Sequence, residues 1–234
     1  MDITEALAEE YLRKYFGVVK YEPDGNIPPD FLCDGRVAVE VRRLNQNYDD
    51  GDGLRGLEET SIPLDKKIRN LLISLGPPTA DKCWFVFYRF QRPIQRWKYL
   101  KLGLEKHLRE FMQEPHSQMV RKSFGGGFEV EIFPSSIKWS SFFVPAGSSD
   151  SEAGGFVLQE IERNLDYCIA EKSRKIKKAK ADYPEWWLVL IDLVGYGLDD
   201  LDRKQFREFV HVEKREFKKV VLLEPRSGGR SFEI

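Results

Sequence analysis

Two short apolar runs, residues 27–32 and 37–44, constrain the fold of this chain more than any other feature of its sequence. The turn-forming residues 33–36 separate them, so we predict two adjacent antiparallel strands joined by a tight turn. Each run carries one acid, Asp30 in the first and Glu40 in the second. Because the turn brings the two strands side by side, we expect these carboxylates to converge at one edge of a sheet.

The second run places a Glu and an Arg on the same side of a mainly apolar strand. Side chains alternate along a strand, so the valines of 37–41 share one face, while Glu40 and Arg42 share the other. If the strand is central, burying these charges costs free energy unless each meets a partner, a metal or a substrate. The alternative is structural: Asp30 is an ordinary turn acid, and Glu40 forms an ion pair with Arg42 or Lys172.

The remaining sequence predicts a mixed α/β protein. Helical spacing and strand-like apolar runs predict helices over 2–16, 62–75, 94–112, 156–183 and 205–211, and strands over 18–21, 83–88, 128–133, 139–144, 186–192 and 220–223. We expect 128–133 and 139–144 to pair like a hairpin, and the polar stretch 45–56 to be a loop. No linker forces a boundary, so we predict a single domain over 1–234.

Two helices carry charged residues beside their apolar faces. In the helix predicted over 156–183, Lys172 lies in the middle of the apolar stripe and Lys175 lies on its edge. A lysine on such a face either reaches a partner or extends its ammonium to solvent. In the first helix, Glu5 and Glu9 lie at the margin of the apolar face, where acids also serve as ordinary complements to the helix dipole.

The composition limits which functions and which cellular compartment we expect for this protein. The formal net charge is −1, which argues against a protein that coats nucleic acid through overall positive charge. Cys33, Cys83 and Cys168 are widely spaced and lie in apolar stretches, so we predict reduced core thiols rather than disulfides. An acidic N-terminus and the lack of a membrane-length apolar run predict a cytoplasmic protein with no membrane contact.

The order of the N-terminal elements resembles a known family. A helix with Glu, a strand, a strand entered by Pro29-Asp30 and a strand with Glu40-Val41-Arg42 are similar to the PD-(D/E)XK nuclease superfamily, which has the restriction-endonuclease-like fold. Pro29-Asp30 matches the first half of the family's motif, and Glu40-Val41-Arg42 matches the second. This chain departs from the motif at Arg42, where the family has a lysine.

The resemblance implies a fold and a domain organisation. It implies an α-β-β-β-α-β core, in which a central mixed sheet is flanked by helices, interrupted by a large α+β insertion over 46–155. The helix of Lys172 and the strand 186–192 would complete that core. In an alternative threading, the helix 62–75 and the strand 83–88 complete it instead.

The resemblance also implies a function. It implies a Mg²⁺- or Mn²⁺-dependent endonuclease that hydrolyses phosphodiester bonds of nucleic acid, DNA in preference to RNA. Asp30 and Glu40 would be metal ligands, with Glu5 or Glu9 contributing from the helix. Arg42 stays protonated and cannot act as a base, but it can clamp a phosphate.

The ammonium that the motif lacks would then come from elsewhere in the chain. By the same resemblance, Lys172 and Lys175 would supply it from their helix. The alternative is a catalytically inactive domain of the same fold that binds nucleic acid or a partner protein, and the substitution at Arg42 favours it.

Overall fold

The chain forms two compact units in a computed structural model. The structure describes residues 1–25, 27–51, 53–78, 82–177, 179, 182–226 and 230–234. Unit 1 consists of Met1–Gln46 with Gly155–Ile234, and unit 2 consists of Asn47–Gly154. Unit 2 lies within the stretch expected to be an insertion, whereas a single domain over the whole chain stays a prediction.

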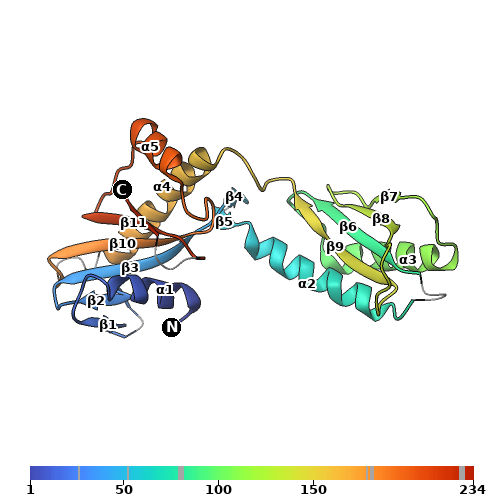
Figure 1. The fold of residues 1–234 in the computed structure, drawn as a ribbon, viewed down its shortest axis with the longest axis horizontal. Coiled ribbons are helices and arrows are strands. Elements are labelled where there is room, and N and C mark those ends of the chain that lie inside the picture. The colour runs from blue at the N-terminus through green and yellow to red at the C-terminus, as the bar shows by residue number, and fades with distance from the viewer. Residues whose placement is uncertain (26, 52, 79–81, 178, 180–181, 227–229) are drawn as a thin grey trace. The chain divides into compact units, whose positions relative to one another are not determined.

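Unit 1 is built on a six-stranded mixed sheet in the order β1-β2-β3-β10-β11-β12 (Figure 1). The first three strands form an antiparallel meander, β10 runs parallel to β3, and β11 runs parallel to β10. β12 closes the far edge as an antiparallel neighbour of β11. The strands are β1 (Val19–Tyr21), β2 (Phe31–Cys33), β3 (Val37–Leu44), β10 (Glu185–Asp192), β11 (Lys219–Leu223) and β12 (Ser231–Glu233).

Helices cover both faces of this sheet. The helices of unit 1 are α1 (Ile3–Leu12), α4 (Val157–Ile176) and α5 (Asp200–Phe209). The face of Val39 and Val41 packs with α1, while the face of Ala38 packs with α4 and α5. The alternation predicted for β3 is therefore confirmed, and it sends Glu40 toward α4. A mixed α/β fold with a central sheet between helices is what the sequence predicted.

The strand that completes the sheet beside β3 is β10. Residues 37–44 pair with 185–192 in parallel register, so that Glu40 lies opposite Leu188. Unit 1 thus contains the elements α1, β1, β2, β3, α4 and β10 in that order along the chain. The alternative threading through 62–75 and 83–88 is wrong, because the strand over 83–88 pairs within unit 2.

The described residues of unit 2 form a four-stranded sheet in the order β7-β8-β6-β9, a two-stranded hairpin of β4 with β5, and two helices. The elements are β4 (Asn47–Asp49), β5 (Leu54–Gly56), α2 (Glu58–Ser74), β6 (Trp84–Phe90), α3 (Trp97–Gln113), β7 (Val120–Ser123), β8 (Glu129–Pro134) and β9 (Phe143–Asp150). α2 and α3 pack on the sheet through one apolar core that includes Leu72 and Leu104.

Two expectations about unit 2 are wrong. The predicted strands 128–133 and 139–144 do not pair, because β6 lies between β8 and β9 and takes both as neighbours. The buried residues of β6 alternate along the strand, because one of its faces packs on the apolar core of unit 2. The stretch 45–56 is not a loop throughout, because it contains the β4–β5 hairpin.

Element ends differ from expectation mainly in the helices. α4 ends at Ile176, and residues 178, 180 and 181 of the helix expected over 156–183 lie outside the described residues. α5 begins at Asp200 rather than near 205, because Asp199 accepts a hydrogen bond from the amide of Asp202 and caps it. Within the described part of the chain, no helix has the length and apolar character needed to span a membrane.

Candidate functional site

Glu40 occupies a position where a charge has no access to water. It lies in the middle of β3, with β2 on one side and β10 on the other, and its side chain is 0% exposed. Because neighbouring residues face α1, the backbone of β3 directs Glu40 toward α4. An isolated carboxylate at such a depth is strongly destabilising, so the site depends on what faces it.

Lys172 of α4 faces Glu40. Cys168, Ile169 and Ile176 pack on the sheet from the same side of α4, so helical spacing points Lys172 at the sheet as well. Its Nζ donates to Glu40 Oε2 at 2.5 Å, and the lysine is only 7% exposed. Of the two possibilities left open for Lys172, contact with a partner is the one that the structure shows, and an ion pair of Glu40 with Lys172 is also what the structural alternative expected.

Asp30 completes the cluster from the residue just before β2. Its Oδ2 lies 3.5 Å from Lys172 Nζ and accepts a hydrogen bond of 2.7 Å from the backbone amide of Val41. That amide follows Glu40 in β3, so the strand pairing itself brings the two acids to one ammonium. The side chain of Asp30 is 22% exposed, which gives the cluster an opening to solvent.

The electrostatics of Glu40 reflect both its burial and its neighbours. Loss of solvation raises the pKa of Glu40 above its ordinary value, the ammonium of Lys172 opposes this rise, and the nearby Asp30 adds to it. Glu40 Oε2 is held by Lys172, but buried Oε1 accepts no hydrogen bond from any residue that the structure describes. A buried acceptor atom without a partner is uncommon in a folded protein and calls for a physical explanation, such as a bound water or ion.

Two further cations of the predicted site lie near the cluster. Lys175 Nζ is 3.8 Å from Glu40 Oε2, and its side chain is 50% exposed, so it forms the margin of the site toward solvent. Arg42 points to the same side of β3 as Glu40. Its guanidinium forms an ion pair with Glu171 and lies 5.0 Å from the centre of the Tyr167 ring.

Glu5 and Glu9 make their contacts away from the acid pair. Glu5 belongs to the capping box of α1 with Asp2 and accepts a hydrogen bond of 3.0 Å from the Tyr21 hydroxyl. Glu9 pairs with Arg13 at 2.5 Å. The physical reason is that α1 packs on the opposite face of the sheet from α4. Among the described residues, no group of three or more His, Cys, Asp and Glu side chains is placed to hold a metal ion.

The donor set nevertheless suits one kind of cation. Mg²⁺ prefers oxygen ligands, and proteins often hold it through one or two carboxylates, with water and substrate phosphate supplying the rest. Asp30 and Glu40 already share one positive charge, that of Lys172, and Glu40 Oε1 is an unused oxygen beside it. By ligand type, Asp30 and Glu40 are therefore the residues of this cluster that could hold a hard divalent cation.

One contact of the site has no signal in the sequence. The hydrogen bond from the Val41 amide to Asp30 depends on the register between the start of β2 and the middle of β3, which residue types do not reveal. The three cysteines are free and buried, as predicted.

Comparison of the chain with protein-family models, with curated proteins and with solved structures finds no match.

Proposed function

We propose that unit 1 hydrolyses phosphodiester bonds of nucleic acid with a divalent cation, Mg²⁺ or Mn²⁺, held by Asp30 and Glu40. The observation that carries this proposal is the convergence of both carboxylates on Lys172 Nζ, at 3.5 Å and 2.5 Å. A restriction-endonuclease-like core would place its functional acids on the same two strands. The order of elements in unit 1 and the parallel pairing of β3 with β10 support that assignment.

In this proposal, each residue of the cluster has a role that follows from its position. Asp30 and Glu40 supply negative oxygens that hold the cation, and the Val41 amide keeps Asp30 oriented toward it. A bound Mg²⁺ would activate water and neutralise charge that develops on the phosphate. Lys172 starts as the counter-ion of both acids, and its flexible stem lets the ammonium turn to a phosphate oxygen.

The cations at the margin complete the proposed site. Lys175 is half exposed and attracts the nucleic-acid backbone toward the cluster. Arg42 is already engaged by Glu171, so contact with a phosphate requires it to exchange one anion for another. In the folded protein as described, Lys172 is therefore better placed than Arg42 to provide the charge that the motif assigns to lysine.

A second candidate function rests on that same ion pair. Lys172 neutralises Glu40 without help from a metal, and Glu171 engages Arg42. A protein in which these pairs are permanent would bind nucleic acid or a protein partner without cleaving anything. The two functions differ in whether the acids bind a divalent cation.

The test is a cleavage assay on the full chain. End-labelled single- and double-stranded DNA and RNA are incubated with Mg²⁺, with Mn²⁺ or with EDTA. The variants are Asp30→Asn and Glu40→Gln, which remove charge but keep shape. The matched control is Glu10→Gln, an acid of α1 whose side chain is 62% exposed and forms an ion pair with Lys14.

The proposal expects metal-dependent cleavage that both site variants lose and the control retains. Loss of a residue that only supports a metal ligand typically lowers activity about tenfold to a hundredfold, so the loss of a ligand's own charge is expected to lower the rate by at least that much. Cleavage that persists in Glu40→Gln refutes the proposed site. A parent protein that cleaves no substrate and shows no heat of Mg²⁺ binding supports the second candidate function.

A further inference from the structure

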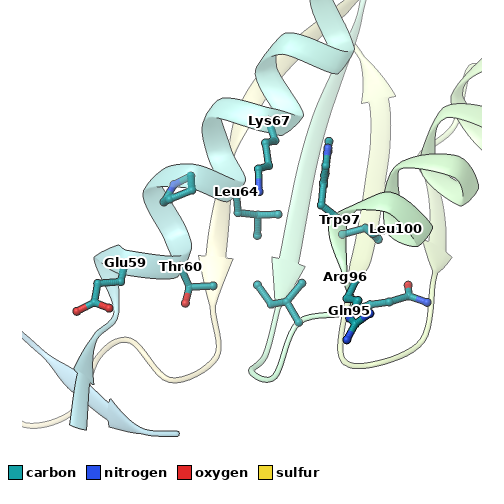
Figure 2. Close-up of a pocket in the computed structure, with 10 residues that line it drawn as sticks. Glu59, Thr60, Leu64, Lys67, Gln95, Arg96, Trp97 and Leu100 are labelled. Atoms are coloured by element: carbon teal, nitrogen blue, oxygen red, sulfur yellow. The ribbon is translucent and has the colours of Figure 1, made fainter. Parts of the chain in front are cut away.

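Unit 2 contains a pocket of about 290 Å³ between α2 and the segment that leads from β6 into α3 (Figure 2). Its walls are apolar where the helices pack, through Leu64 of α2 and Leu100 of α3. Its lining also includes charged side chains, those of Glu59, Lys67 and Arg96. This volume is just below the usual range for small-molecule sites, about 300–1,000 Å³, so the pocket suits a small ligand or part of a larger one.

An aromatic ring and two cations face this space. Figure 2 shows Lys67 and Trp97 on opposite walls of the pocket, and Lys67 Nζ lies 6.0 Å from the centre of the Trp97 ring. Arg96 precedes Trp97 at the start of α3. Within the described residues, neither Lys67 nor Arg96 forms an ion pair, so an anion that binds them displaces no carboxylate, while the Lys67 ammonium already lies over the Trp97 ring. Glu59 is the one acid among the lining residues, and Figure 2 shows it at the far margin.

The start of α3 adds to the positive character of the pocket. Arg96 is the N-cap residue, its side chain makes no capping hydrogen bond, and the first turn of α3 contains no acid. The positive end of the helix dipole is therefore not compensated by a side chain of its own first turn. Together with Lys67 and Arg96, it favours a negatively charged group at the mouth of the pocket.

We infer that this pocket binds a nucleotide, with the base against Trp97 and the phosphate between Lys67 and Arg96. Base stacking on an aromatic side chain is tolerant of sequence, and Lys and Arg side chains are ordinary phosphate ligands. The bound nucleotide is either a free mononucleotide or one residue of a single-stranded nucleic acid. The inference concerns unit 2 alone and does not require that unit 1 hydrolyses anything.

The experiment is isothermal titration calorimetry of the full chain in EDTA, so that no metal-dependent cleavage can occur. The probes are adenosine 5′-monophosphate, adenosine, inorganic phosphate and a short oligodeoxyadenylate. The variants are Trp97→Leu, which keeps an apolar side chain at a partly buried position, and Lys67→Gln, which changes an exposed residue. The matched control is Lys66→Gln, an exposed lysine of α2 outside this pocket.

We expect adenosine 5′-monophosphate to bind at least tenfold more tightly than adenosine or phosphate alone. Trp97→Leu and Lys67→Gln are each expected to weaken binding about tenfold, while Lys66→Gln leaves it unchanged. Tighter binding of the oligonucleotide than of the mononucleotide identifies a strand as the source, and equal binding identifies a free nucleotide. The inference is overturned if the parent protein binds none of the probes, if phosphate binds as well as the nucleotide, or if Lys67→Gln has no larger effect than Lys66→Gln.

Discussion

Replacing Lys172 by methionine tests the buried cluster through protein stability. Methionine keeps the length and apolar stem of the side chain and removes the ammonium. Glu40, which is 0% exposed, then loses a partner at 2.5 Å, while the ammonium of Lys175 remains at 3.8 Å. Breaking a buried ion pair from one side costs about 3–5 kcal/mol. We expect the lower end, about 3 kcal/mol, because Lys175 remains and Glu40 can take up a proton.

The pH dependence of this loss gives an independent check. Burial already raises the pKa of Glu40 above its ordinary value of 4.5, and removing Lys172 removes the strongest influence that lowers it. A carboxyl whose folded-state pKa is raised stabilises the fold below the unfolded pKa, and that stability is lost as the pH rises through the folded pKa. The loss of unfolding free energy in Lys172→Met, relative to wild type, is therefore largest at neutral pH and becomes smaller as the pH falls toward 4.5.

Urea unfolding followed by circular dichroism measures the effect. With a slope of about 3 kcal/mol per molar urea, a loss of 3 kcal/mol lowers the midpoint by about 1 M. The control is Lys175→Met on the same helix, whose half-exposed ion pair is worth about 0–1 kcal/mol. The double variant Glu40→Leu/Lys172→Met removes both charges and is expected to recover most of the loss. If Lys172→Met lowers the free energy of unfolding no more than Lys175→Met does, then Lys172 and Glu40 do not form a buried ion pair.

Three further predictions concern other parts of the chain. Arg92→Met removes a buried guanidinium that binds Asp150 and Glu152, each at 2.6 Å, so we expect a thermal-shift loss equivalent to about 3–5 kcal/mol, against about 0.5 kcal/mol for the exposed Arg109→Met. Burial lowers the pKa of His107, so the free energy of unfolding is expected to fall as the pH drops below the ordinary value of 6.5. His107→Phe is expected to remove this dependence on pH, and a dependence that stays the same in the variant contradicts the prediction. Asp199→Ala removes the cap of α5 and is expected to cost about 1 kcal/mol in urea unfolding, while no loss means that the cap contributes nothing.

Local periodicity predicted which face of its own element each of Glu40 and Lys172 occupies, but not whether Lys172 meets a partner or extends to solvent. Alternation along 37–44 placed Glu40 on one face of a strand, and the apolar stripe of the long helix placed Lys172 toward the core. Each pattern constrains its own element, and a buried charge on each side requires a partner. Their meeting at 2.5 Å follows once β3 and α4 pack together.

What the sequence could not predict depends on contacts between distant elements. Arg42 shares a face with Glu40, but its pairing with Glu171 is decided by how α4 is rotated over β3. Glu5 and Glu9 lie on a helix whose apolar face can be predicted from its sequence. The local sequence does not indicate which face of the sheet that helix covers. The central position of β6 in unit 2 likewise comes from pairing across long stretches of chain.

The most direct test of the account is a crystal structure of the protein soaked with Mn²⁺. The account predicts an anomalous density peak in contact with carboxylate oxygens of both Asp30 and Glu40, with Lys172 moved away from Glu40 Oε2 or sharing it. Absence of a peak at these acids, with Lys172 still paired to Glu40 at high Mn²⁺ concentration, contradicts it. The pair would then be a structural ion pair in the core of unit 1.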